Sequence, residues 1–307
     1  MGRAAMSRMR GAAIILAMLI AALAAAVAAT VLAEQQRWSR TVLHRRDQVQ
    51  AQALAMAGVQ WARQILEEDG RRPEIDHLGE PWALTLPPIP MEDGEIRGAI
   101  VDAQGRLNVN VLGLAEAASP ERTRLAALFA ASGAPPATAD IVADWIDGDS
   151  ATRESGAEDG FYLAQRTPRL APNAPLLRVA EIGAAKDMTP RAVAALLPFL
   201  SALPTGTPVN VNTAPPEVLA AIVENLDAER REKLLAERAR KPFTTIAEFR
   251  ARLPDGATLA SDAALAVASR YFLITIDARQ GAAHSRARAL VRRGGATNST
   301  IVWQVVE

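Results

Sequence analysis

The chain has 307 residues, with 34 basic and 34 acidic side chains and no cysteine. This length is enough for one large domain or two ordinary ones with a hydrophobic core. The balanced charge gives no overall field that would draw the chain to nucleic acid or to acidic lipid. The absence of cysteine excludes disulfides, thiolate catalysis and cysteine-ligated metal.

The first element is an apolar segment, residues 11–33, in which 23 residues carry no charge. A helix of this length crosses a bilayer of about 30 Å, and Arg3, Arg8 and Arg10 before it favour a cytoplasmic start. A cleaved secretory signal is the alternative, because several small-x-small triplets here would suit a signal peptidase. Helix-forming sequence continues without proline as far as Gly70, which favours a retained anchor.

The pattern predicts one helix over residues 12–68, of which 12–33 span the membrane and the rest is amphipathic. In the amphipathic part, apolar side chains recur at helical spacing in two neighbouring lines: Trp38, Val42, Val49, Ala53 and Met56, and Leu54, Gly58, Trp61 and Ile65. We expect these lines to pack on a folded domain.

Strand patterns occur in two places far apart in the sequence. Residues 95–112 predict a hairpin that turns at Ala103-Gln104-Gly105, where Gly105 allows positive φ. Residues 271–278, 285–293 and 299–306 are β-branched or alternate between apolar and polar. Together these segments predict a single antiparallel sheet on the amphipathic half of the helix. The expected fold is therefore α+β, with a large all-α domain inserted between strands.

The inserted region, 115–268, shows capping residues and prolines at the starts of short helices. Helices are predicted at 120–131, 138–146, 189–200, 215–226, 228–240 and 245–253.

An acidic, glycine-containing loop follows the second of these helices. Its carboxylates are Asp144, Asp147, Asp149, Glu154, Glu158 and Asp159. Oxygen ligands of this kind suit Ca²⁺, although the spacing is not that of an EF-hand, and a solvated acidic loop is the alternative. A hydrolase would use two of these acids as a general acid/base pair, but His44, His77 and His284 are scattered and no nucleophile constellation is present. We therefore expect no enzymatic activity.

A second motif, "VNVNTAPPEVLAAI" at 209–222, resembles the start of a DNA-binding helix-hairpin-helix module. Such a module needs a glycine-rich hairpin whose N–H groups meet phosphate, whereas residues 226–241, where the hairpin would follow, contain no glycine and are crowded with acidic residues. Membrane-anchored or secreted DNA binding is the alternative function. The preferred interpretation is structural, with Asn210, Asn212 and Thr213 capping and bracing a helix start, and we expect no nucleic-acid partner.

The N-terminus resembles that of type IV prepilins and type II secretion pseudopilins, in which an inner-membrane prepilin peptidase cuts after a glycine. The resemblance implies a leader at 1–11, cleavage between Gly11 and Ala12, and methylation of Ala12. Most members have glutamate at the fifth mature position, where this chain has Leu16. That departure argues against a major pilin and matches the one pseudopilin type known to lack the glutamate.

The whole chain resembles the general secretion pathway protein K (GspK) family, the large minor pseudopilins of the type II secretion system. The segments that carry the resemblance are "MRGAAIILAMLIAALAAA", "DQVQAQALAMAGVQWARQIL", "VDAQGRLNVN", the acidic loop and "VNVNTAPPEVLAAI". The resemblance implies helix 1 and the first strands at 12–114, the insert at 115–268 and the last strands at 269–307. The amphipathic part of helix 1 and those first strands would occupy 34–114.

The family resemblance also implies a role, a location and a ligand. A member of this type is a single-pass inner-membrane protein with a periplasmic bulk, placed at the tip of the pseudopilus to start assembly and support secretion. Its implied partners are the other minor pseudopilins, the major pseudopilin, the prepilin peptidase, and exoprotein cargo or the secretin. The implied cofactor is structural Ca²⁺ held by Asp147, Asp149, Glu158 and Asp159, with Asp144 and Glu154 as further candidates.

Overall fold

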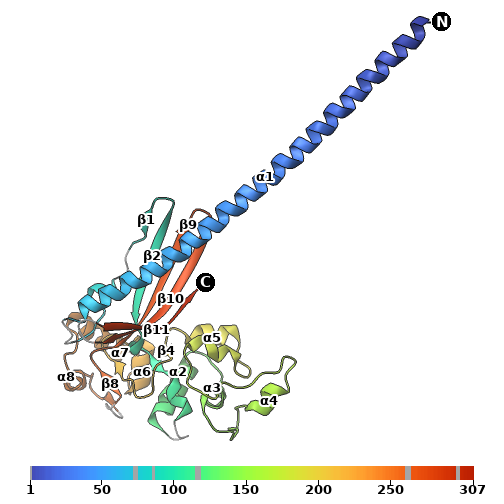
Figure 1. Ribbon diagram of the computed structural model, residues 1–307. Helices are drawn as coiled ribbons and strands as arrows, with labels where there is room; N and C mark the ends of the chain where they lie inside the picture. Colours follow the sequence, from blue (N-terminus) through green and yellow to red (C-terminus); the bar gives the residue numbers. More distant parts are fainter. Residues whose placement is uncertain (1, 72–74, 85–86, 115–118, 260–263, 295–297) are drawn as a thin grey trace.

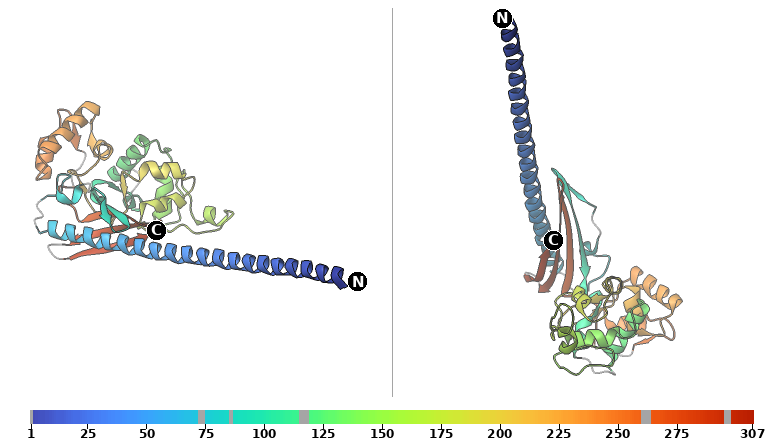
Figure 2. Two further views of the ribbon diagram at one scale, coloured as in Figure 1. Left: turned by 90° about the horizontal axis from the view of Figure 1, so that it is seen from above. Right: turned by 90° about the vertical axis from the view of Figure 1, so that its right-hand side faces the viewer.

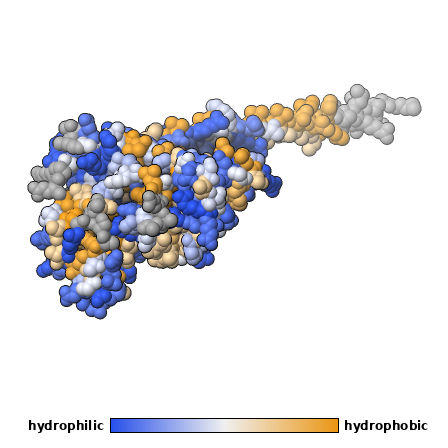
Figure 3. Space-filling view, turned by 90° about the horizontal axis from the view of Figure 1, so that it is seen from below, coloured by the Kyte–Doolittle hydropathy of each residue, from blue (hydrophilic) through white to orange (hydrophobic). Residues whose placement is uncertain are grey.

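The computed structural model describes residues 2–71, 75–84, 87–114, 119–259, 264–294 and 298–307, and for residues 2–13 the backbone alone. Helix α1, Gly2–Asp69, is a continuous rod of 68 residues. Its first half projects from the folded body, and its second half lies along the sheet (Figure 1). From residue 14 onward, the projecting part has a largely apolar surface (Figure 3). It is long and apolar enough to cross a membrane, and none of its apolar stretch is buried against the protein.

Behind α1 lies a five-stranded antiparallel sheet, in the order β1-β2-β9-β10-β11. Its strands are β1 (Ile89–Met91), β2 (Gly94–Asp102), β9 (Tyr271–Gln280), β10 (Ala283–Gly294) and β11 (Asn298–Val306). The predicted late strands and the α+β fold are therefore confirmed. Pairs such as Ile100 with Ile274 join β2 to β9 across the whole length of the insert.

The face of α1 that packs on the sheet differs in part from the predicted one. The buried helix positions are mostly small: Ala51, Ala55, Gly58, Val59, Ala62 and Leu66. A Cβ added to Gly58 would lie 2.8 Å from Cγ2 of Ile276, so the helix axis comes close to the strands. Trp38, Val49 and Trp61, which the sequence placed on the packed face, are 69%, 65% and 49% exposed. The prediction was right for Leu54, Gly58 and Ile65, which pack against this core. It was wrong for the bulky residues, because close approach to the strands selects small side chains.

The predicted hairpin at 95–112 is also wrong. The chain turns within the sheet at residues 92–93 instead, between β1 and β2. After Asp102 it leaves the sheet through a 3-10 turn, and the next strand, β3 (Leu107–Asn108), pairs with the insert. Gly105 has no positive φ; its role is to leave room for Thr213, whose Oγ1 would lie 2.8 Å from an added Cβ.

The insert gathers at the end of the sheet away from the projecting half of α1 (Figures 1 and 2). Its helices are α2 (Pro120–Ala131), α3 (Thr138–Ile146), α4 (Asp159–Leu163), α5 (Pro190–Leu196), α6 (Pro216–Ile222), α7 (Ala228–Arg240) and α8 (Ile246–Ala251). Short strand pairs join them: β3 with β4 (Leu200–Ser201), β5 (Val209–Asn210) with β8 (Leu265–Ala266), and β6 (Val223–Glu224) with β7 (Thr258–Leu259).

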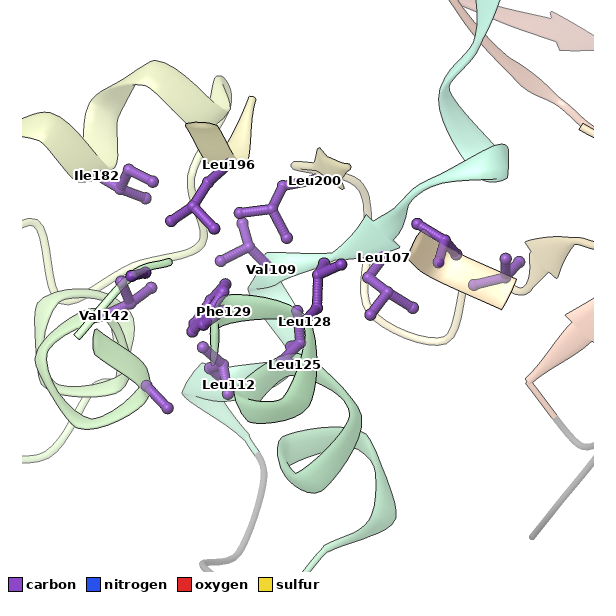
Figure 4. Close-up of a cluster of buried hydrophobic side chains, with 14 of the residues drawn as sticks. Leu107, Val109, Leu112, Leu125, Leu128, Phe129, Val142, Ile182, Leu196 and Leu200 are labelled. Carbon is purple, nitrogen blue, oxygen red and sulfur yellow. The ribbon is translucent and has the colours of Figure 1, made fainter. Parts of the chain in front are cut away.

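The insert and the α1–sheet unit have separate hydrophobic cores. The core of the insert includes Leu125, Leu128 and Phe129 of α2 and Leu196 of α5 (Figure 4). The core of the other unit lies between α1 and strands β9 and β10. The boundaries at 115 and 268 stay a prediction.

A buried polar network joins the two units. Asp102 Oδ2 accepts hydrogen bonds from Asn210 Nδ2 at 3.0 Å, Thr213 Oγ1 at 2.6 Å and Ser269 Oγ at 2.6 Å. Asp76 accepts from the backbone N–H of Ser269 at 2.6 Å. These contacts hold together the segment after α1, the end of β2, the β5 region within the insert and Ser269, which follows the insert.

Candidate cation site in the acidic loop

The acidic loop connects α3 to α4, and aromatic packing holds these helices side by side. The rings of Trp145 in α3 and Tyr162 in α4 meet edge to face, with centroids 4.8 Å apart. The Tyr162 hydroxyl accepts a hydrogen bond from the backbone N–H of Lys186 at 3.1 Å. The end of α3 and the start of α4 therefore face each other, although about a dozen residues separate them in the sequence.

Three of the four predicted ligands come together at this point. Carboxylate oxygens of Asp147, Asp149 and Glu158 lie within 4.8 Å of one another. Asp147 directly follows α3 and Glu158 directly precedes α4. The fourth predicted ligand, Asp159, lies outside this group, and its Oδ1 accepts a hydrogen bond from the N–H of Ala171 at 2.9 Å.

Several carboxylate oxygens of this group have no partner. Both oxygens of Glu158 are buried without a hydrogen bond among the described residues, and so is Oδ1 of Asp147. Glu158 is only 9% exposed. Burial, reinforced by the charges of Asp144, Asp147 and Asp149, raises the pKa of Glu158 to about 7. A buried carboxylate without a partner is costly, and a bound cation would remove that cost.

The remaining acidic residues of the loop have other roles. Asp144 is fully buried in α3 and accepts from the guanidinium of Arg153 at 2.6 Å and from its backbone N–H at 3.0 Å. Arg153 also pairs with Asp147. A Cβ at Gly156 would overlap Asp144, so this glycine permits the close packing. Glu154 is exposed.

Arg153 is the residue of this site that the sequence reasoning missed. Its only signal in the sequence is its position as a base in the middle of an acidic run. Arg153 forms ion pairs with Asp144 and Asp147. Among the described residues, it forms none with Asp149 or Glu158. The site keeps an excess of negative charge on its outer side, beside a surface cavity of about 480 Å³ lined by Glu158 and Asp159. Its oxygen donors and charge fit a hard divalent cation such as Ca²⁺.

The residues of the helix-hairpin-helix-like motif serve the interior of the protein. Asn210, Asn212 and Thr213 are all buried. Asn212 accepts from the N–H of Phe243 at 2.8 Å and donates to the carbonyl of the same residue at 2.9 Å. The cap of α6 is Pro215, which makes no side-chain capping bond. The expected capping role is therefore wrong. Asn210 and Thr213 instead bond to Asp102 at the end of β2, and Asn212 joins two segments within the insert.

The processing residues lie in the projecting rod. Gly11 and Ala12 belong to the part of α1 that is described by its backbone alone. Leu16 follows on the same helix and is 60% exposed. Cleavage and methylation at this point stay predictions.

The long apolar helix, the antiparallel sheet packed on its second half and the inserted helical domain define the class of this protein. It is an α+β protein of the pseudopilin class, with an N-terminal helix that is a candidate membrane anchor. Family models described as type II secretion system (T2SS), protein K match residues 105–205 and 209–268. The chain belongs to the protein K family of the type II secretion system.

Individual relatives agree with this assignment. The chain is 33% identical to type II secretion system protein K of Pseudomonas aeruginosa, over 88% of this chain and 85% of the relative. It is 30% identical to the protein K of Klebsiella pneumoniae, over 94% of each chain. Among solved structures, it resembles a chain of the GspK-GspI-GspJ complex from enterotoxigenic Escherichia coli. That match has a TM-score of 0.68 and 25% identity, and covers 89% of this chain and 98% of the other.

Proposed function

We propose that this chain is a non-enzymatic minor pseudopilin at the tip of the type II secretion pseudopilus. There it initiates assembly of the fibre and supports the export of folded proteins across the outer membrane. Its mature N-terminal helix anchors it in the inner membrane, and its sheet and insert occupy the periplasm.

The observation that carries this proposal is the opposite placement of the anchor and the insert. α1 projects from one end of the sheet, and the helical insert lies at the other end (Figures 1 and 2). Subunits that pack along α1 would therefore meet the rod and the sheet, while the insert extends beyond them. Such a subunit caps a fibre. Leu16 adds support, because a first subunit has none ahead of it whose N-terminal amine would need a glutamate.

The proposed partners are the other minor pseudopilins. The solved relative assembles with GspI and GspJ, as the name of that complex states, and we infer an equivalent heterocomplex for this chain. The major pseudopilin would follow below it, the prepilin peptidase would process it at Gly11, and the distal insert would face cargo or the secretin. The exposed Trp38, Val42 and Val49 of α1 give the heterocomplex an apolar surface on which to assemble.

We further propose that Asp147, Asp149 and Glu158 bind a structural Ca²⁺ ion. The unpartnered oxygens of Glu158 support this assignment, as does the position of the three residues at the facing ends of α3 and α4. A cation there would fix the loop between the two helices. Asp159 supports the same loop through its bond to Ala171 without contacting the ion.

The assembly role is tested by processing and co-purification in a strain that carries the whole secretion system. Mass spectrometry of the mature chain should find an N-terminus at Ala12. Affinity capture in detergent should recover the two other minor pseudopilins from the same organism. An N-terminus at Ala29 or Glu34 would show a cleaved secretory signal and overturn the proposal, as would capture of the chain alone.

A further inference from the structure

A small cavity lies between the sheet and the insert, on the face of the sheet opposite to α1. Its volume is about 110 Å³, somewhat less than the roughly 150 Å³ of an apolar cavity known to hold benzene. The sheet side is formed by Leu273, Leu290 and Trp303, which lie in one cross-strand row of β9, β10 and β11. The insert side is formed mainly by residues 177–180 and 197–203. The cavity is therefore of a size to admit one aliphatic side chain.

Two residues of the lining carry buried polar atoms without hydrogen-bond partners among the described residues. Ser201 is only 5% exposed, and its hydroxyl has no hydrogen-bond partner among the described residues. The indole N–H of Trp303 is likewise buried and unpaired there. Buried polar atoms are rarely left unpaired in folded proteins, so two of them at one cavity indicate a missing acceptor.

A guanidinium adds positive charge to the same lining. Arg106 makes one long hydrogen bond, from Nη1 to the carbonyl of Leu197 at 3.3 Å, and burial lowers its pKa. Asp102 is close enough to act on it electrostatically, but the oxygens of that carboxylate are already used in the buried network. Among the described residues, no carboxylate forms an ion pair with Arg106.

All charged residues of the lining are basic. Besides Arg106 it contains Arg178 and Arg288, and it contains no acidic residue. Those two arginines already have partners outside the lining, since Arg178 pairs with Glu181 at 3.0 Å and Arg288 with Glu307 at 2.8 Å. Arg106 is therefore the group that a negatively charged ligand would meet.

We propose that this cavity is a docking site for a polypeptide segment of a partner protein that presents an apolar side chain next to a carboxylate. The apolar side chain enters between Leu273, Leu290 and the insert. The carboxylate accepts hydrogen bonds from Arg106, with the hydroxyl of Ser201 and the indole N–H of Trp303 as further donors. A convergence of a few donors on a preformed apolar pocket is the usual form of a ligand site, and charge-assisted bonds to a guanidinium are among the stronger ones. The site is independent of the acidic loop and of any bound cation.

The test uses the full chain in detergent micelles and two short peptides. One is an acetylated, amidated leucine–glutamate dipeptide, and the other is its leucine–glutamine counterpart, which has the same shape without the charge. Binding is followed by tryptophan emission, and W303F identifies the contribution of Trp303. We expect the glutamate peptide to bind about tenfold more tightly than the glutamine peptide, because one charge-assisted hydrogen bond distinguishes them.

Variants locate the binding. R106Q should reduce the affinity for the glutamate peptide to that for the glutamine peptide, whereas R178Q, which changes a lining arginine that already has a partner, should leave the preference intact. A202L should fill the cavity and weaken both peptides. Melting curves of the variants check that each is folded.

Equal affinity of the two peptides, or a preference that survives R106Q, would overturn the proposal. Octanoate provides the third ligand, because a fatty acid offers an apolar chain and a carboxylate without a peptide. If octanoate binds in an Arg106-dependent way and the peptides do not, the site belongs to a lipid and the assignment to a polypeptide is wrong.

Discussion

The carboxylate of Asp144, fully buried in α3, lies 2.6 Å from Nη1 of Arg153. This ion pair supplies the inner side of the acidic loop with its own positive charge. The outer side, made by Asp149 and Glu158, receives none from it. Arg153 therefore neutralises the charge on the inner side of the loop. A bound cation would act on the outer side, at Asp149 and Glu158.

Calcium should raise the melting temperature of the full chain, and EDTA should lower it. Ca²⁺ at a hundred times its dissociation constant would add about 2.7 kcal/mol to the free energy of unfolding. E158Q should lose most of this response, whereas E154Q, which changes an exposed carboxylate of the same loop, should keep it. Differential scanning calorimetry measures both. A melting temperature of the wild type that is insensitive to Ca²⁺ would show that the assigned site is wrong.

In the absence of metal, E158Q should stabilise the protein. Glu158 has a pKa raised from 4.5 to about 7, so the free energy of unfolding falls as the pH rises from about 4.5 to 7, and the full loss is present above 7. Metal-free E158Q should therefore be more stable than metal-free wild type at pH 8, and the two should converge below about pH 4. A metal-dependent hydrolase would instead be identified by activity that E158Q abolishes.

Asp102 should make the junction between the two units sensitive to pH. Burial raises its pKa from 3.8 to about 6, although hydrogen bonds from Ser269 and Thr213 oppose the change. Because the folded-state pKa is the higher one, the carboxyl contributes stability at low pH that is lost as the pH rises from about 4 to 6. The free energy of unfolding of the wild type, relative to D102N, should fall by about 2 to 3 kcal/mol over this range and be flat above it. Urea titrations at several pH values test this, and a pH-independent difference would contradict it.

Replacing Asn210 should destabilise the junction more than its size suggests. Its Nδ2 donates to the carbonyl of Asp76 at 3.1 Å and to Asp102 at 3.0 Å, and its Oδ1 accepts from the N–H of Asn212 at 3.0 Å. N210A leaves these buried groups without that partner, at a cost of about 2 to 3 kcal/mol. The matched control is N298A, at an exposed position at the start of β11, which should change stability by less than about 0.5 kcal/mol. Denaturant unfolding compares the two, and equal effects would rule out a special role for Asn210.

The close contact between α1 and the sheet should not tolerate a side chain at Gly58. A leucine there would collide with Ile276 and Ile96, whose Cγ2 and Cδ1 atoms would lie 2.8 and 3.0 Å from the Cβ alone. G58L should therefore lower the free energy of unfolding by about 1 to 3 kcal/mol or more, despite its gain in helix propensity. A57L, at the exposed neighbouring position, should be near neutral. Thermal melts that rank the two variants the other way would show that the helix packs differently.

Much of the fold could be predicted from local signals. Ser119 and Asp227 cap α2 and α7 through hydrogen bonds to the backbone, and both helices begin and end as the sequence indicated. The alternation in β10 likewise identified its buried face. These features depend on near neighbours in the chain, which the sequence displays directly.

The predictions that were wrong concern contacts between residues far apart in the sequence. Gly105 looks like a turn glycine, but its smallness serves Thr213, more than a hundred residues later. Trp61 looks like a core residue of α1, but the sheet accepts only small side chains at its closest approach. In the acidic loop, the family resemblance implied four calcium ligands and did not rank them. Only the folded positions of α3 and α4 show that Asp159 lies apart from the other three.

The pairing of β2 with β9 has a consequence for how the chain matures. Asp102 lies opposite Phe272 in the sheet, yet the ribosome makes the entire insert between them. The insert has its own core and can collapse as soon as it emerges, whereas the central strands of the sheet arrive last. Until then the small-residue face of α1 lacks β9 and β10, which form most of the surface that covers it. Closing so large a loop is slow, so the unit made by α1 and the sheet would stay incomplete until translation has almost finished.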